Sequence, residues 1–85
     1  MSDELRKFLA QEARFNKLTA KLAKETNSAK KAELYSIIGS LRYFGKGCPQ
    51  CQHKAAEMWS LALALNPQHR ETRVMVNSLL VAKEV

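Results

Sequence analysis

The sequence predicts a small all-α domain, and two observations carry that prediction. Apolar residues recur at helical spacing in four segments, which are separated by short runs rich in glycine, proline, asparagine and serine. No segment alternates between apolar and polar residues as a strand does, and β-branched residues are too few to support a sheet. We therefore expect a small bundle of about four antiparallel helices.

The first helix is expected to occupy the N-terminal segment, residues 1–27. Ser2 suits the N-cap position, and two acidic residues follow it in the first turn, where the helix dipole favours negative charge. The helix is expected to end near Glu25. Residues 26–28, Thr-Asn-Ser, can then cap a second helix, or they can lie inside one long bent helix.

The next two helices are expected to form a helix-turn-helix unit over residues 28–66. The second helix should run from about residue 29 to residue 44, because the glycine-rich stretch from Gly45 permits the left-handed backbone that ends a helix. The third helix should begin between residues 50 and 53 and end at Leu65.

The last segment, residues 67–85, is expected to form a capping helix that completes one domain. Asn66 suits its N-cap, and Pro67 suits its first turn, where a missing N–H costs nothing. The side chains of this helix that are expected to face the core are Val74, Met75, Val76, Leu79 and Leu80.

The net charge of +6 is concentrated in residues 1–54, which hold eleven Lys or Arg and five acids. Four of these basic residues follow a 3-4-3 spacing that places them on one face of a helix. They form what we call the basic face: Arg14, Lys17, Lys21 and Lys24. The basic face is either a solvated outer surface, which we favour, or a surface for acidic protein groups or phosphates. Nucleic acid is therefore an allowed but not a favoured partner.

Residues between Tyr35 and Pro67 follow an ordered pattern of large, small and aromatic positions. The positions are Tyr35, Ile38, Gly39, Ala55, Trp59, Ala62 and Pro67. This pattern resembles the tetratricopeptide repeat, a pair of antiparallel helices, and it fits if about four extra residues occupy the corner between them. The resemblance implies a single helical hairpin that the flanking helices cap.

The same resemblance implies a concave surface that binds a peptide or helix of another protein, as adaptors, chaperones and assembly factors do. Because one repeat is fewer than the roughly three that usually make a stable array, a homo- or hetero-oligomer is also in keeping with it. Trp59 is expected to be a core residue as well as part of the contact platform. The expected partner-binding residues are Leu34, Tyr35, Ile38, Leu41, Arg42, Tyr43, Lys46, Trp59 and Leu63.

A second pattern lies in the third helix. The run Ala55-Ala56-Glu57-Met58-Trp59-Ser60-Leu61-Ala62, with Phe15-Asn16-Lys17-Leu18 upstream, resembles the AraC negative regulator family and the related PerC-type activators. This resemblance implies a small transcriptional regulator that acts on another regulator or on DNA. It is the alternative to the interaction module.

The corner Cys48-Pro49-Gln50-Cys51-Gln52-His53 is the one place where reactive chemistry could occur. Two thiols at this spacing can be free, can form a disulfide or can cycle as a redox pair, and Cys48, Cys51, His53 and His69 could together bind a zinc ion. We favour two free thiols and no metal. No pair of carboxylates accompanies a nucleophile, so we expect no enzymatic activity, no catalytic residue and no cofactor.

The chain is expected to be cytoplasmic and to have no membrane span. No apolar run approaches the roughly 18 residues that a membrane-spanning helix needs. Residues 1–4, Met-Ser-Asp-Glu, lack the basic-then-apolar order of a secretory signal.

Overall fold

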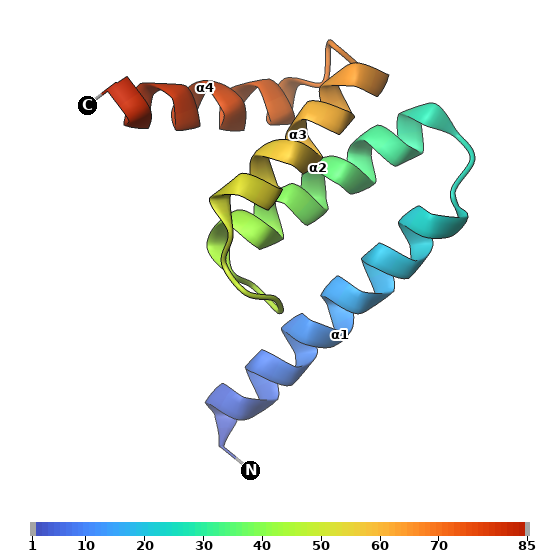
Figure 1. Cartoon of the computed structure of the whole chain (residues 1–85). Coiled ribbons are helices and arrows are strands. Elements are labelled where there is room, and N and C mark those ends of the chain that lie inside the picture. The colour runs from blue at the N-terminus through green and yellow to red at the C-terminus, as the bar shows by residue number, and fades with distance from the viewer. Residues whose placement is uncertain (1, 85) are drawn as a thin grey trace.

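Four helices make up the computed structural model, which describes the backbone of residues 2–84 and the side chains of residues 2–79. The helices are α1 (Asp3–Lys24), α2 (Ser28–Phe44), α3 (Gln52–Leu65) and α4 (Arg70–Glu84) (Figure 1). No strand occurs within residues 2–84, and the predicted all-α class is confirmed. Every helix in this part of the chain is too short or too polar to cross a bilayer.

α1 and α2 are separate helices, because residues 25–27 leave the helical conformation between them. The Ser2 side chain caps the start of α1 by accepting a hydrogen bond from the Leu5 N–H at 3.2 Å. Asn27 caps α2 in the same way, with its side-chain oxygen 3.0 Å from the Lys30 nitrogen. The alternative of one long bent helix is thereby excluded.

α2 and α3 run antiparallel and lie side by side, and their contact is the most extensive between any two elements described (Figure 1). Gly45 ends α2 in the left-handed conformation, with φ of 67°. Gly47 also has a positive φ, and a Cβ added to it would collide with the Gln11 carbonyl oxygen. The loop between α2 and α3 therefore packs directly against the middle of α1.

The interface between α2 and α3 is built around Trp59, whose side chain is fully buried. Its indole N–H donates a hydrogen bond to the carbonyl oxygen of Ser36 at 3.2 Å. Gly39 provides the space for the ring, because a Cβ there would lie only 2.6 Å from Trp59 Cδ1. The ring can therefore lie against the backbone of α2.

α1 adds a second cluster of buried side chains where Phe15 packs with Ile38 and Leu41 of α2. The partly buried side chains packed against this cluster are Leu18, Leu22, Ile37, Cys48 and Met58. The N-terminal end of α1 projects beyond the α2–α3 loop (Figure 1). Its large apolar side chains are accordingly exposed: Leu5, Phe8 and Leu9.

The predicted start of the last helix is wrong. Asn66 is the C-cap of α3, and residues 66–69 form a turn closed by a hydrogen bond from the His69 N–H to the Asn66 carbonyl oxygen at 3.0 Å. The Asn66 side chain also accepts from the Gln68 N–H at 3.2 Å. Asparagine followed by proline suits the first two positions of such a turn as well as it suits a helix start.

α4 begins at Arg70 and packs against α3. Val74 does not face the core as expected, because 55% of it is exposed. Met75, Val76 and Leu79 are half-buried, and Leu80 lies outside the side chains described.

The helices lie close to a single layer. The principal extents are 42, 38 and 17 Å. The shortest of them is only a few ångströms more than the diameter of one helix with its side chains, about 10–12 Å. Its radius of gyration is 13.6 Å, against about 12 Å for a compact chain of the same length. A flat molecule of this size has a small core and leaves much of each helix accessible.

Candidate partner-binding groove

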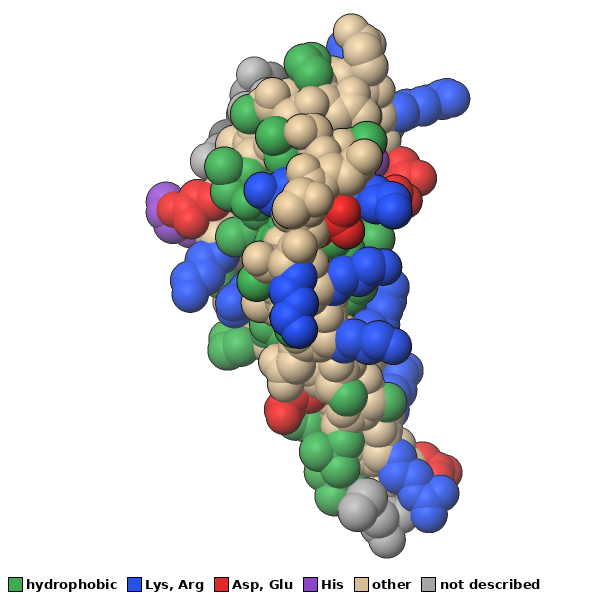
Figure 2. All heavy atoms as spheres, turned by 90° about the vertical axis from the view of Figure 1, so that its right-hand side faces the viewer, with side chains coloured by type: hydrophobic (Ala, Val, Ile, Leu, Met, Phe, Trp, Pro, Cys, Tyr) green, Lys and Arg blue, Asp and Glu red, His purple; other side chains and the backbone are tan. Residues whose placement is uncertain are grey.

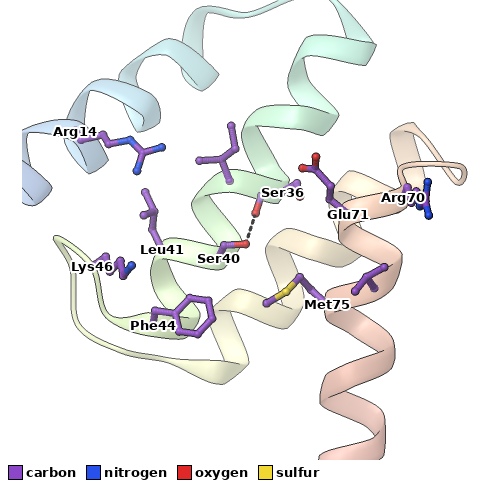
Figure 3. Close-up of a pocket in the computed structure, with 11 residues that line it drawn as sticks. Arg14, Ser36, Ser40, Leu41, Phe44, Lys46, Arg70, Glu71 and Met75 are labelled. Atoms are coloured by element: carbon purple, nitrogen blue, oxygen red, sulfur yellow. Dashed lines mark hydrogen bonds between the residues drawn. The ribbon is translucent and has the colours of Figure 1, made fainter.

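A groove with a volume of about 730 Å³ lies between α1, α2 and α4 (Figure 3). Its volume falls in the range of about 300–1,000 Å³ that is usual for ligand-binding clefts. The lining residues from α2 are Ser36, Ile37, Ser40, Leu41 and Phe44. The others are Arg14 from α1, Lys46 from the following loop, and Arg70, Glu71, Val74 and Met75 from α4.

The floor of the groove is apolar and partly open to solvent. Phe44 and Val74 are each 55% exposed, whereas Ile37 and Met75 are half-buried and Leu41 is buried. Exposed apolar side chains gathered in a concave site, rather than scattered singly, are typical of surfaces that bind a partner. We use the term floor for these five side chains.

The groove exists because α4 leaves α3 at a sharp turn (Figure 1) and places its first turns across the groove from α2 (Figure 3). Thr72 secures the first turn of α4, since it is fully buried and its hydroxyl lies 2.8 Å from His69 Nδ1. The next turn of the same helix carries Val74 and Met75 into the groove. The turn at residues 66–69 thus sets where the α4 side of the site lies.

Charged side chains surround the floor. Figure 3 shows Arg14 and Lys46 on the side of α1 and the loop, and Arg70 and Glu71 on the side of α4. All four are exposed. Among the described side chains the only ion pair joins His53 to Glu57 on α3, so the three cations of the rim have no carboxylate partner there.

The expected partner-binding residues differ in burial and in whether they line the groove. Leu34, Ile38 and Trp59 are 6%, 4% and 0% exposed and do not line the groove, so they are packed inside the protein and do not form a contact platform. This corrects the expectation from the sequence, because helical spacing alone does not distinguish the face toward α3 from the face toward solvent. Leu41 and Lys46 do line the groove.

The other expected contact residues are half-buried, and several already have partners within the chain. The guanidinium of Arg42 lies 4.7 Å from the centroid of the Phe15 ring, a cation–π distance. The Tyr43 ring packs 5.6 Å from the ring of Trp59 and 5.0 Å from that of Phe44. The remaining two of this group are Tyr35 and Leu63.

The basic face lies along α1, and each of its four side chains is exposed. Figure 2 shows Lys and Arg side chains gathered on the side of the molecule that carries α1. Arg14 belongs to both surfaces, because it also lines the groove. The other three residues, Lys17, Lys21 and Lys24, lie outside it.

The cysteine corner holds two free thiols with different surroundings. Cys48 donates a hydrogen bond to the Leu41 carbonyl oxygen at 3.6 Å, and burial raises the pKa of its thiol while the charge of Arg42 opposes that effect. Cys51 is the N-cap of α3, and its sulfur lies 3.5 Å from the Lys54 nitrogen. Each thiol therefore serves the local structure.

The four zinc ligands suggested by the sequence are not assembled into a site. No group of three or more His, Cys, Asp or Glu side chains comes together among the described residues. His53 contacts Glu57 at 3.0 Å on α3, and His69 contacts Thr72 at the start of α4.

Several groove residues were not expected from the sequence. For Tyr43 and Phe44, which precede Gly45, the sequence leaves open whether they close the end of the helix or whether one of them stays exposed in a groove, and it places Val74 toward the core. Ile37 is recognisable as part of an apolar stripe, but nothing in the sequence assigns it, Arg70 or Ser40 to a groove, because that role depends on where α4 lies relative to α2.

Comparison of the chain with family models, with curated proteins and with solved structures finds no match. The resemblances of residues 32–67 and 55–62 to known families therefore stay predictions.

Proposed function

We propose that this protein is a non-enzymatic interaction module, a small cytoplasmic adaptor, chaperone or assembly partner that holds a segment of another protein in the groove. The single observation that carries the proposal is the apolar floor, on which Phe44 and Val74 are each more than half exposed inside a concave site. A partner that covered this floor would remove apolar area from water.

The arrangement of α2 and α3 also supports the tetratricopeptide-like interpretation. The two helices are antiparallel, and the contact between Gly39 and Trp59 brings them close together where the repeat has its small and aromatic positions. In this interpretation α4 takes the place of the first helix of a following repeat. The groove between α2 and α4 then corresponds to the concave surface on which such repeats bind peptides.

The test uses substitutions of exposed side chains, which should leave folding intact. Phe44→Gln and Val74→Gln remove apolar contacts from the floor without adding charge, and Leu61→Gln is the matched control because Leu61 is 43% exposed on α3 outside the groove. A photo-reactive amino acid in place of Glu71 would cross-link whatever segment occupies the groove in the native cell, and mass spectrometry would identify the segment.

The proposal predicts one cross-linked segment in the wild type and in the Leu61→Gln variant, and loss of that product in both groove variants. The same cross-links in all four proteins, or none in any of them, would contradict it. Circular dichroism on each variant would check that the helices are retained.

A second candidate function is transcriptional regulation, and the basic face favours it. Arg14, Lys17, Lys21 and Lys24 are exposed along one helix, and no described carboxylate pairs with them. Such a row of cations can contact phosphates, and release of counterions would make that binding weaken steeply as salt rises. Mobility shift of duplex DNA at low and high salt tests this candidate: no retention at low salt would exclude direct DNA binding.

A further inference from the structure

The charges around the groove are strongly unequal. Arg14, Lys46 and Arg70 stand against the single carboxylate of Glu71, in a chain whose net charge is +6. Because these side chains are exposed and the described cations have no ion-pair partner within the chain, their field extends into the site. A ligand in the groove therefore meets an apolar floor under a positive potential.

On one side of the groove, two of the cations lie next to apolar side chains of the floor. Figure 3 shows Arg14 and Lys46 turned toward the cavity from the same side, with Phe44 and Leu41 beside them. The Lys46 ammonium lies 5.9 Å from the centroid of the Phe44 ring. A ligand that covers Phe44 with an apolar side chain and carries a carboxylate next to it would satisfy both features at once.

We infer that the occupant of the groove is an acidic amphipathic helix, with large apolar side chains on the floor and Asp or Glu residues directed to Arg14 and Lys46. The inference rests on the proposed function and adds the chemistry of the partner. A helix is favoured over an added strand because the described residues contain no sheet edge, and the floor is built from the side chains of two helices.

Ligands of other chemistry match only one of the two features of the groove, its cations or its apolar floor. Free phosphate or a nucleic acid backbone would neutralise the cations but would leave Phe44 and Val74 exposed. A neutral or basic helix would cover the floor but would leave the cations unpaired, or would bring like charges together. An acidic helix with an apolar face satisfies both parts of the groove.

The first experiment compares three synthetic peptides of about 16 residues, long enough to form a helix on binding. All three carry leucine at the i, i+3, i+4, i+7 spacing, and their remaining positions are rich in Glu, in Gln or in Lys. Dissociation constants for the full chain are measured by isothermal calorimetry at about 0.05 and 0.3 M salt. We expect the Glu peptide to bind roughly tenfold more tightly than the Gln peptide at low salt, the Lys peptide to bind most weakly, and the differences to shrink at high salt.

The second experiment moves the charge on the protein. Arg14→Glu combined with Lys46→Glu reverses the charge on one side of the groove, and we call these two substitutions the groove pair. Lys17→Glu combined with Lys24→Glu, the control pair, makes the same change in net charge outside the groove. At low salt we expect the groove pair to weaken binding of the Glu peptide by about tenfold and to favour the Lys peptide, and the control pair to have a clearly smaller effect on either affinity, which falls below about twofold at high salt.

The outcomes separate the partner's chemistry from the proposed function itself. Equal affinity for all three peptides, abolished by Phe44→Gln, would overturn the acidic ligand and leave the groove as a binding site. Equal weakening by the groove pair and the control pair would also overturn it, because the attraction would then be diffuse. Failure of every peptide to bind, or binding that Phe44→Gln and Val74→Gln leave unchanged, would contradict the groove as the site.

Discussion

Trp59 joins the two central helices. Its ring is fully buried against Gly39 and Tyr43, and its N–H is satisfied by the carbonyl oxygen of Ser36. The sequence predicted this position well, because alanines four residues before Trp59 and three after it mark one helix face. The sequence could not show that the same burial removes Trp59 from the surface that a partner touches.

Replacing Trp59 by Ala is expected to lower the free energy of unfolding by about 3–5 kcal/mol, because it removes a large buried side chain and leaves a cavity. Leu61→Ala is the control, since Leu61 lies two residues away and is 43% exposed. Urea unfolding followed by circular dichroism measures both. A Trp59→Ala variant that is as stable as Leu61→Ala would contradict the core role of the ring.

The Cys48 thiol is expected to react slowly in the folded protein. Burial raises its pKa above the ordinary value of 9.0, so less of the reactive thiolate is present near pH 8. Alkylation of a Cys51→Ser variant, followed by mass spectrometry with and without urea, should therefore be faster in urea. Equal rates would show that the thiol is not shielded.

The raised pKa of the Cys48 thiol also predicts how the stability of the protein depends on pH. A thiol whose pKa is raised by folding contributes stability that is fully present below its unfolded pKa and is lost as the pH rises through the folded value. The stability of the Cys51→Ser variant should thus decline above about pH 9 more than that of a variant in which Cys48 is also serine. Identical profiles would contradict this.

At the scale of the elements, the helix ends are where local chemistry and tertiary structure can be compared directly. Ser2 and Asn27 have side chains suited to an N-cap, and Gly45 has the backbone freedom suited to a left-handed C-cap. The predicted ends of α1 and α2 accordingly agree with the structure to within a residue or two. Asn66-Pro67 suits both a helix start and a turn, and the turn occurs. Thr72 is fully buried after this turn, and no local pattern in the sequence indicates that burial.

Asn27→Ala is expected to cost about 1 kcal/mol of stability, because it removes the side-chain oxygen that accepts the Lys30 N–H at the start of α2. Thr26→Ala is the control, since Thr26 is exposed and lies one residue outside the cap. Thermal unfolding of both variants measures the difference. Equal melting temperatures for the two variants would mean that the Asn27 cap does not stabilise the start of α2.

At the scale of the whole molecule, the groove is a property of the arrangement and not of any one segment. Arg14, Phe44 and Val74 are about thirty residues apart along the chain, and they share a site only because α1 and α4 lie on either side of α2. Periodicity identifies the apolar positions of each helix, but it does not say which neighbour covers them. This is why the number of helices could be predicted, whereas most of the floor could not.

The flat shape has a consequence for the same site. With an extent of 17 Å in its thinnest direction, the molecule has little interior, and a partner on the groove would add buried apolar area to a thin domain. We therefore expect the Glu-rich peptide to raise the melting temperature in a concentration-dependent way. No shift at saturating peptide would count against binding to the folded state.

The most direct test of the groove as the partner site is a titration of the isotope-labelled protein with the Glu-rich peptide, followed by two-dimensional NMR of the backbone amides. We expect the chemical-shift changes to concentrate on residues 36–46 and 70–75, with Phe44 and Val74 among them. Changes confined to Lys17, Lys21 and Lys24, or to the outer face of α3 around Leu61, would contradict it.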